Sequence, residues 1–422
     1  MLDVRAAGRR PWWAALGLAV GLACVAGERG DAAIDPSPAV VTVAPVVAPQ
    51  PVEPEPASKA ATLELTFVGD LVLGRYLADE RYLPMHPAGS DPFAQVREQL
   101  AADLVVGNLE SPVMFELPKR SPSRRAKNRF AGSAVEVEQL ADAGFSVVSL
   151  ANNHFFDLGV TGQREAPQVL AAAGIVAVGA SREREDGPAI RVETVETQGW
   201  RIGFVAFTTR FGDRGEPEGP RVPLLSLPEV DEALLPAVRA ARADHDLVIV
   251  TVHWGVEYAD EADATRRLLA HHLLAAGVDL VIGHHPHVLQ AIERHPSGRS
   301  EGGESARDGL IAYSLGNFLF HRGDHPSGLS GVLRVRYQAQ NGSRPCLAEA
   351  RLHPVTLVRR THWTPEAASE GPAAKVRDRV VSLSGATRTR WQREGERGDP
   401  DRGEDLVLTG LRECPSADPR SL

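Results

Sequence analysis

The sequence predicts an α/β protein in which helices cover a sheet. Between Leu63 and about Val358, short apolar runs alternate with longer amphipathic segments. The short runs are rich in Val, Ile and Leu, which is typical of strands buried on both faces. The later runs lie closer together and favour antiparallel pairing. The predicted strands are Leu63–Val68, Leu104–Val106, Val147–Leu150, Ile202–Phe207, Leu247–Val252, Leu280–Ile282, Leu310–Ser314 and Val332–Tyr337.

Helices are predicted between several of these strands. Gly144, Gly174 and Gly277 stand where three of the amphipathic segments should end. Glycine adopts the left-handed conformation that often closes a helix, so these residues are expected to be C-terminal caps. The predicted helices are Ala134–Ala143, Glu165–Ala173, Glu229–Ala241 and Ala262–Ala276.

Residues 1–27 are typical of an export signal. Three Arg residues precede an apolar run from Trp12 to about Gly27, which is short for a membrane span. Cys24 lies in a sequence that partly resembles a lipoprotein cleavage site, so it is either removed with the signal or lipidated. A Pro-rich linker at residues 28–61 follows as a spacer. We expect an exported protein of the periplasm or cell envelope, tethered to the membrane if Cys24 carries a lipid.

The composition restricts the partners. With 43% hydrophobic and 24% charged residues, the chain is a globular protein with enough apolar material for a large core. Its formal net charge of −9 gives no reason to expect nucleic acid as a partner. A polyanionic substrate would need local positive charge, which metal ions could supply.

The C-terminal part is expected to differ from the folded domain at residues 62–358. Residues 359–422 are rich in Arg, Glu, Ser, Pro and Gly and are predicted to be a charged, partly disordered tail. Leu406–Leu411 is a short apolar exception that could dock onto the core. Cys346 and Cys414 could pair in an oxidising compartment, and the sequence leaves this open.

Polar clusters follow nearly every predicted strand. Each cluster alone could be a turn, a loop or a buried polar side chain. The carboxyl ends of strands line the ligand crevice of an open α/β sheet, so together the clusters predict one shared site. The clusters are Gly69-Asp70, Gly107-Asn108-Leu109-Glu110, Asn152-Asn153-His154, His253-Trp254-Gly255, Gly283-His284-His285-Pro286-His287 and Gly316-Asn317.

The residue types in these clusters indicate metal chemistry. Carboxylates, a carboxamide and several imidazoles, without thiolates, suit Mn, Fe, Zn or Mg. More than four such ligands can hold two divalent ions, which would polarise a phosphoryl or acyl oxygen. His154 directly follows Asn153, so one of them could bind metal while the other acts as a general acid.

The same motifs carry a family resemblance. Together with Asp157-x-Gly159 and Ser314-Leu315-Gly316-Asn317-Phe318, the chain over about residues 62–358 resembles the bacterial CapA family, associated with capsule and poly-γ-glutamate synthesis. That family is similar to calcineurin-type metallophosphoesterases, which implies a four-layer α-β-β-α sandwich and makes His154 the candidate acid. The metal ligands implied are Asp70, Glu110, Asn153, His253, His285 and His287.

The chain departs from ordinary metallophosphoesterases at two positions. It has Val72 where they have a His two residues after the first Asp, and Glu110 where they have a bridging Asp. One metal subsite would therefore have fewer ligands, and one ion or two could bind.

Other residues are expected near the site. Asp157 could cap a helix or orient His154 as part of the catalytic pair. Asn108, His284 and Asn317 are expected to bind substrate. The basic segment Arg120–Arg129 could be a solvated loop or a clamp for an anionic polymer.

The predicted function is that of a metal-dependent hydrolase or transferase acting on an anionic envelope polymer or its precursor. Two alternatives remain open. The domain could be a non-catalytic accessory protein that binds the polymer or a membrane-bound capsule synthase, or it could be a general periplasmic phosphoesterase.

Overall fold

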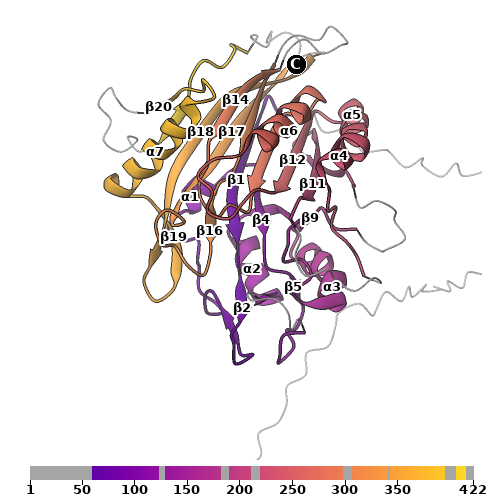
Figure 1. Ribbon diagram of the computed structural model, residues 1–422, viewed down its shortest axis with the longest axis vertical. Helices are drawn as coiled ribbons and strands as arrows, with labels where there is room; N and C mark the ends of the chain where they lie inside the picture. Colours follow the sequence, from indigo (N-terminus) through magenta and orange to yellow (C-terminus); the bar gives the residue numbers. More distant parts are fainter. Residues whose placement is uncertain are drawn as a thin grey trace, which may run out of the picture. The chain divides into compact units, whose positions relative to one another are not determined.

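The computed structural model describes residues 59–122, 129–181, 190–210, 219–297, 307–340, 343–394 and 405–414. The predicted signal and nearly all of the predicted linker lie outside these residues, as do residues 123–128 of the basic segment. Figure 1 shows two large sheets with helices packed around them. The predicted α/β class is confirmed. None of the helices in the described part of the chain has the length and apolar character that a membrane crossing requires.

The first large sheet has ten strands. Its main path runs through β20 (Trp391–Arg393), β21 (Leu406–Leu408), β18 (Ser343–Arg359), β17 (Leu329–Gln340), β1 (Thr62–Leu71), β4 (Leu104–Leu109), β8 (Phe145–Ser149) and β9 (Val176–Val178). β16 (Asn317–Leu319) pairs with β1, and β19 (Trp363–Ala367) pairs with β18. The strands from β1 to β9 are parallel, whereas β17, β18, β21 and β20 continue the sheet through antiparallel pairs.

The second large sheet has six strands. They follow the order β10 (Glu193–Thr197), β11 (Trp200–Thr208), β12 (Leu247–His253), β13 (Leu280–His284), β15 (Arg307–Ala312) and β14 (Ile292–Ser297). The four central strands are parallel, and β10 and β14 pair antiparallel at the two edges. Every predicted strand overlaps a strand of one of these two sheets.

Strand β11 shows how the two sheets share a core. Successive side chains of a strand point to opposite faces. Ile202 and Phe204 belong to an apolar core that also contains Leu65 and Phe67 of β1. Val205 and Phe207 point the other way, into a second core built with helices from the region after β11. The second sheet is therefore buried on both faces, as its Val- and Ile-rich strands predict.

Helices pack on both sheets. α4 (Leu227–Glu229), a π-helix (Val230–Leu234), α5 (Leu235–Asp244) and α6 (Ala264–Ala275) supply the second core, and α2 (Ala134–Asp142) and α3 (Gly159–Ala172) pack on the first sheet near β8 and β9. The predicted glycine caps are confirmed, because Gly144, Gly174 and Gly277 have φ of 92°, 76° and 112°. α3 begins at Gly159 rather than at the predicted Glu165, since its glycine-rich first turn lacks the composition of a helix. The four-layer arrangement stays a prediction.

Short elements complete the body. α1 (Arg97–Leu100) precedes β4, and β2 (Gly74–Tyr76), β3 (Tyr82–Pro84) and β6 (Arg129–Phe130) form a small sheet. β5 (Val113–Met114) and β7 (Gly132–Ser133) form another.

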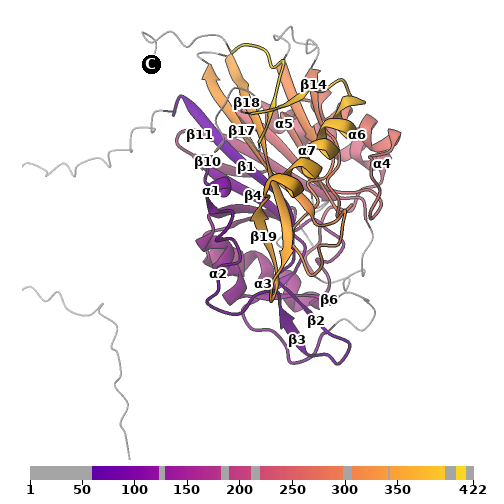
Figure 2. The same cartoon turned by 90° about the vertical axis from the view of Figure 1, so that its left-hand side faces the viewer.

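The first part of the predicted tail contains folded elements. β18 extends to Arg359, and β19 and α7 (Glu370–Gly385) follow it. Figures 1 and 2 show α7 beside β18. Ala373, Val376 and Val380 recur at helical spacing on α7 and are fully buried, which places this helix in the folded body despite its charged composition. Residues 395–404 and 415–422 of the predicted tail lie outside the described residues.

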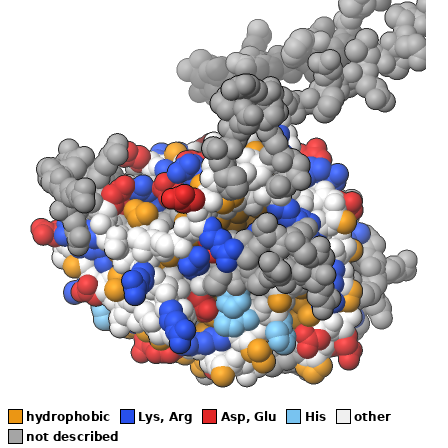
Figure 3. Space-filling view, turned by 90° about the horizontal axis from the view of Figure 1, so that it is seen from above, with side chains coloured by type: hydrophobic (Ala, Val, Ile, Leu, Met, Phe, Trp, Pro, Cys, Tyr) orange, Lys and Arg blue, Asp and Glu red, His pale blue; other side chains and the backbone are white. Residues whose placement is uncertain are grey.

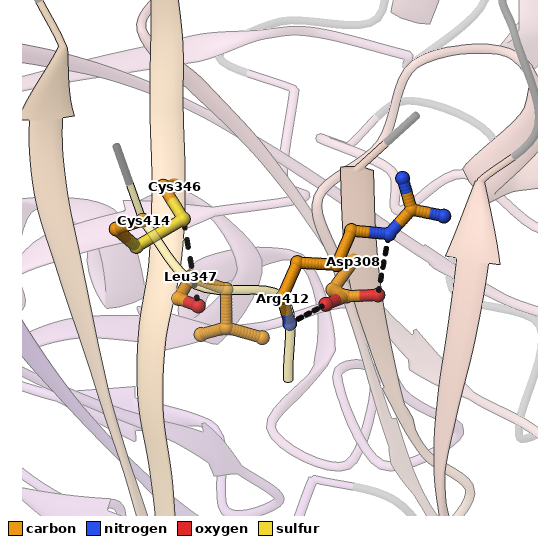
Figure 4. Close-up of a disulfide and its surroundings, with 5 residues drawn as sticks. All are labelled: Asp308, Cys346, Leu347, Arg412 and Cys414. Atoms are coloured by element: carbon orange, nitrogen blue, oxygen red, sulfur yellow. Dashed lines mark hydrogen bonds and ion pairs between the residues drawn. A yellow bond between two sulfur atoms is a disulfide. The ribbon is translucent and has the colours of Figure 1, made fainter. Parts of the chain in front are cut away.

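The segment around Cys414 is attached to both sheets. The docking predicted for Leu406–Leu411 is confirmed at β21, which pairs with β18. Cys346 and Cys414, whose pairing the sequence leaves open, form a disulfide (Figure 4). The Arg412 backbone N–H donates to Asp308 Oδ2 at 2.8 Å, which ties the same segment to β15.

Candidate metal centre

The polar clusters predicted from the sequence meet at one edge of the two sheets. Asp70, in β1, is in register with Asn108 of β4 on one side and with Asn317 of β16 on the other. In the second sheet, His253 is in register with His284 at the carboxyl ends of β12 and β13. Parallel strands end at the same edge, which is why residues far apart in sequence come together here.

Asp70 is the buried anchor of the site. Asn108 Nδ2 donates to its Oδ1 at 2.9 Å, and the His285 backbone N–H donates to its Oδ2 at 3.3 Å. His287 Nδ1 lies 3.2 Å from Oδ2, and His284 Nδ1 lies 3.4 Å from Oδ1. Burial raises the pKa of Asp70, but the hydrogen bonds and charges of His284 and His287 bring it well below its usual value. The carboxylate is therefore ionised.

Glu110 has the environment of a metal ligand. Both carboxylate oxygens are buried, and neither has a hydrogen-bond partner among the described residues. Its Oε1 lies 3.7 Å from His253 Nε2, 3.8 Å from His287 Nε2 and 3.9 Å from His154 Nε2. Burial, with the charge of Asp70 adding to it, raises the pKa of Glu110 to about 7. A buried carboxylate ringed by imidazole nitrogens costs free energy unless a cation or proton satisfies it.

His285 and His253 present uncharged imidazole nitrogens to the site. Both ring nitrogens of His285 are buried and have no hydrogen-bond partner in the described structure. Burial and the charge of His287 lower the pKa of His285 to about 3, and burial and His285 bring the pKa of His253 well below its usual value. Neutral imidazole is the form that coordinates metal, so both rings are ready to bind a cation.

His285 and His287, in the loop after β13, have an unusual backbone conformation that sets the direction of their imidazoles. His285 and His287 have φ of 96° and 58°, in a region that residues with a Cβ rarely adopt. Such strain persists only where the surroundings hold it, and it is common at functional sites.

At this site, three groups of described side chains could each hold a metal ion. The ligand atoms in each group lie within 4.8 Å of one another. Glu110 belongs to two of them, and nitrogen and oxygen donors without thiolate suit a divalent ion of the Mn, Fe or Zn type. The donor set therefore fits a metal. The groups are Glu110–His253–His285, Asp70–Glu110–His287 and Glu257–His285–His287.

Asn153 and His154 also reach this site. Asn153 Oδ1 lies 2.7 Å from His253 Nε2. His154 Nδ1 lies 2.8 Å from Asp157 Oδ2, and the opposite ring nitrogen faces Glu110. Burial lowers the pKa of His154, but the charge and hydrogen bond of Asp157 outweigh it and raise the pKa. Asp157 orients this ring and does not cap α3, whose N-cap residue is Leu158.

The three residues expected to bind substrate lie beneath the ligands. Asn108, His284 and Asn317 are all at most 2% exposed. Asn317 Oδ1 lies 3.0 Å from His287 Nδ1, and its Nδ2 donates to the Ser327 carbonyl oxygen at 3.2 Å. Their burial favours a role in orienting ligands over direct contact with a substrate.

Sequence reasoning gave no role to Glu257 and Asn152. Glu257 is exposed, and only the fold brings it to His285 and His287. Asn152 Nδ2 donates to the Leu109 carbonyl oxygen at 2.9 Å, and its Oδ1 accepts from the His154 backbone N–H at 3.0 Å. The position of Asn152 next to Asn153 in the sequence could have indicated that its side chain holds the backbone of Leu109 and His154 in place.

Comparisons with known proteins agree with the motifs. A family model described as "Bacterial capsule synthesis protein PGA_cap" matches residues 64–322, more than half of the sequence. The chain belongs to this family, and the resemblance predicted from the sequence is confirmed.

Curated relatives carry related names. The chain is 34% identical to the "Capsule biosynthesis protein CapA" of Bacillus anthracis over 62% of this chain and 60% of that protein. It is 32% identical to the "PGA biosynthesis protein CapA" of Bacillus subtilis (strain 168) over 62% and 64%. A "Probable polyglutamine synthesis accessory protein" of Mycobacterium tuberculosis is 32% identical over 35% and 40%. The chain thus matches less than two thirds of the length of these relatives.

Solved structures show a weaker likeness. A hypothetical protein from Thermus thermophilus has a TM-score of 0.35 and 19% identity, covering 73% of this chain and 100% of that one. The purple acid phosphatase PPD1 of yellow lupin seeds has a TM-score of 0.34 and 12% identity, covering 74% and 54%. A likeness of this extent does not establish a shared fold.

Proposed function

We propose that this protein is a metal-dependent hydrolase or transferase that acts on an envelope polymer or its precursor during capsule or poly-γ-glutamate synthesis. The observation that carries the proposal is Glu110, a buried carboxylate without a hydrogen bond that faces three imidazoles. Neither a structural core nor a simple binding surface needs such a group. A metal centre does.

Two divalent ions, of Mn, Fe, Zn or Mg, would be held by carboxylate, carboxamide and imidazole groups. Glu110 would be shared between them, since it belongs to two of the donor groups. Bound metal would supply Lewis-acid chemistry toward a phosphoryl or acyl oxygen. The proposed ligands are Asp70, Glu110, Asn153, His253, His285 and His287.

His154 is the proposed general acid. Its Nδ1 is held by Asp157, so the Nε2 side is presented to the centre. The raised pKa of His154 keeps a proton available near neutral pH for a leaving group. Asp157 fixes the ring orientation and tautomer, and it supports the positive charge.

Positive charge beside the centre suits an anionic substrate. The pKa of His285 is lowered first by burial, then by the charge of His287 and then by the positive charge of Arg210. The Arg322 guanidinium lies 6.0 Å from the centre of the Tyr258 ring, which in turn lies 6.0 Å from the ring of His287. On the face drawn in Figure 3, in contrast, basic and acidic side chains of the described residues are interspersed. The chain as a whole has a net charge of −9, but the basic side chains beside the centre would attract an anion there.

Export of the chain is part of the proposal. Structural disulfides form in oxidising compartments such as the periplasm, and Cys346–Cys414 is such a bond. This supports a periplasmic or cell-envelope location, with residues 1–27 as the signal and Cys24 as a candidate lipid attachment site.

Metal content tests the proposal directly. The purified full chain is expected to retain Mn, Fe or Zn in stoichiometric amounts by elemental analysis, and Asp70→Ala with His285→Ala is expected to lower the retained amount by the ions that this centre holds. Failure to retain any of these ions, or Mg, after separate loading would refute the metal centre. With the matching metal restored, assays on anionic polymers and on small phosphate esters separate a polymer enzyme from a general periplasmic phosphoesterase.

The second candidate function is a non-catalytic accessory protein that binds the polymer or a membrane-bound synthase. Val72 favours it, because this buried apolar residue packs with Met85 and Phe320 where ordinary metallophosphoesterases have a ligand. The name of the Mycobacterium tuberculosis relative also includes the word accessory. Under this alternative, His154→Ala leaves polymer binding unchanged, and no ester or amide turnover is found with any metal.

A further inference from the structure

A second group of metal donors lies outside the candidate metal centre. It consists of His271 on α6 and Glu293 and His295 on β14, the edge strand of the second sheet. Residues two apart on a strand point to the same face, so Glu293 and His295 are side by side. α6 packs against this strand (Figures 1 and 2), which brings His271 over both of them.

The donor atoms of this group converge. His271 Nε2 lies 2.9 Å from Glu293 Oε1, and His295 Nδ1 lies 3.7 Å from the same oxygen. All three ligand atoms lie within 4.8 Å of one another. The side chains of His271 and His295 are 35% and 32% exposed, whereas that of Glu293 is 7% exposed. The carboxylate therefore forms a buried base beneath two imidazoles that water and ions can reach.

Tyr313 orients the Glu293 carboxylate. Its hydroxyl donates to Glu293 Oε2 at 2.7 Å, which leaves Oε1 directed at the two imidazoles. Burial raises the pKa of Glu293, but hydrogen bonds from His295 and Tyr313 and the charge of His271 bring it below the usual value. Burial also raises the pKa of Tyr313, so the phenol remains a donor. This is how an outer partner commonly orients a metal-binding carboxylate.

The two imidazoles stack against each other above Glu293. Their rings are stacked with centroids 4.2 Å apart and an interplanar angle of 18°. Imidazole nitrogens bind a metal in the plane of the ring. Because both side chains are about one third exposed, a rotation of one ring can bring a nitrogen of each imidazole and Glu293 Oε1 to one divalent ion.

We propose that His271, Glu293 and His295 form a second, solvent-facing metal site for Zn²⁺ or a neighbouring late transition-metal ion. Two imidazoles and one carboxylate are a common zinc donor set, and imidazole disfavours Mg²⁺ and Ca²⁺. Water completes the coordination. An ion bound there joins α6 to the edge strand β14 and so stabilises the folded state of this edge.

The site can be tested in a background in which the candidate metal centre is disabled. The full chain carrying Asp70→Ala and His285→Ala is titrated with Zn²⁺ by calorimetry, and Co²⁺ absorption reports the coordination. We expect one equivalent of Zn²⁺ with Kd below about 10 μM and a tetrahedral Co²⁺ spectrum. His271→Ala and His295→Ala should each weaken binding by at least about 100-fold, and Tyr313→Phe by about 10-fold.

His272→Ala is the matched control. His272 is the next residue on α6, is 48% exposed and does not belong to the donor group, so its loss should leave Zn²⁺ affinity unchanged. Circular dichroism confirms that each variant is folded. Absence of Zn²⁺ binding in the background variant, or binding that survives both His271→Ala and His295→Ala, would overturn the proposal.

Discussion

Asp157 Oδ2 lies 2.8 Å from His154 Nδ1 and also accepts a hydrogen bond from the Phe130 backbone N–H at 2.9 Å. The carboxylate is thereby fixed from two directions, and it fixes the imidazole in turn. The free nitrogen of His154 is directed at Glu110, 3.9 Å away. A buried acid–imidazole pair of this kind holds one tautomer and one ring orientation.

Replacing Asp157 should change the acidity of His154. Asp157→Asn removes the charge that offsets burial, so we expect the pKa of His154 to fall and any turnover to drop by about 10- to 100-fold. NMR titration of the His154 ring measures the pKa without a substrate. An unchanged pKa would show that Asp157 has only a structural role.

Glu110 and Glu257 should differ as ligands. Glu110→Gln is expected to abolish Mn²⁺ binding at the candidate metal centre while leaving the melting temperature of the metal-free chain no lower, because the variant removes a buried charge without a hydrogen bond. Glu257→Gln changes an exposed residue of one donor group and should weaken metal binding by about 10-fold or less. Calorimetric titration with Mn²⁺ and thermal melting of both variants test this. Equal losses of affinity would contradict it.

Metal affinity at the candidate centre should increase as the pH rises from 7 to 9. Burial raises the pKa of Glu110 to about 7. Burial lowers the pKa of His287, but Glu110, Asp70 and Asn317 together raise it to about 9. Both groups must lose a proton before they bind a cation, so affinity should rise by up to about tenfold per pH unit while one group titrates. Calorimetry in buffers of different ionisation enthalpy measures the released proton.

The metal-free chain should show the opposite trend. The pKa of His287 in the folded state lies above its unfolded value, so its contribution to stability is complete below about pH 6.5 and is lost as the pH rises to about 9. Melting curves with and without metal between pH 7 and 9 should therefore diverge. Parallel curves would mean that these groups do not bind the ion.

Adjacent valines on α7 test whether the C-terminal helix belongs to the folded body. Val380 is fully buried, whereas Val381 is 42% exposed. Val380→Ala should lower the free energy of unfolding by about 2 kcal/mol, and Val381→Ala should change it by less than about 0.5 kcal/mol. Urea denaturation measures both. Equal small effects would mean that α7 does not pack on the sheets.

Much of the site could be predicted because its residues follow strands with strong apolar signals. Asp70, His253 and His285 each follow such a run within a few residues, and parallel pairing brings the ends together. The order of the strands could not be predicted, since strands far apart in the sequence, such as β1 and β16, pair with each other. This pairing places Asn317 beside Asp70.

The missed features had weak local signals. Glu257 is one exposed acid among many, and only the loop after His253 places it beside His285 and His287. α7 has its buried apolar positions at Ala373, Val376 and Val380, but the charged residues Lys375, Arg377, Asp378 and Arg379 stand between them. Such a short apolar stripe becomes significant only when β17 and β18 are present to cover it.

The bond between Cys346 and Cys414 sets an order of events for maturation. Its second sulfur lies 68 residues after the first, beyond β19, α7, β20 and β21. The disulfide therefore cannot form until the chain through Cys414 has been synthesised and has reached an oxidising environment. Oxidation is consequently a late step, and a chain stopped or cleaved ahead of Cys414 would carry an unpaired thiol on β18 that quality control could recognise.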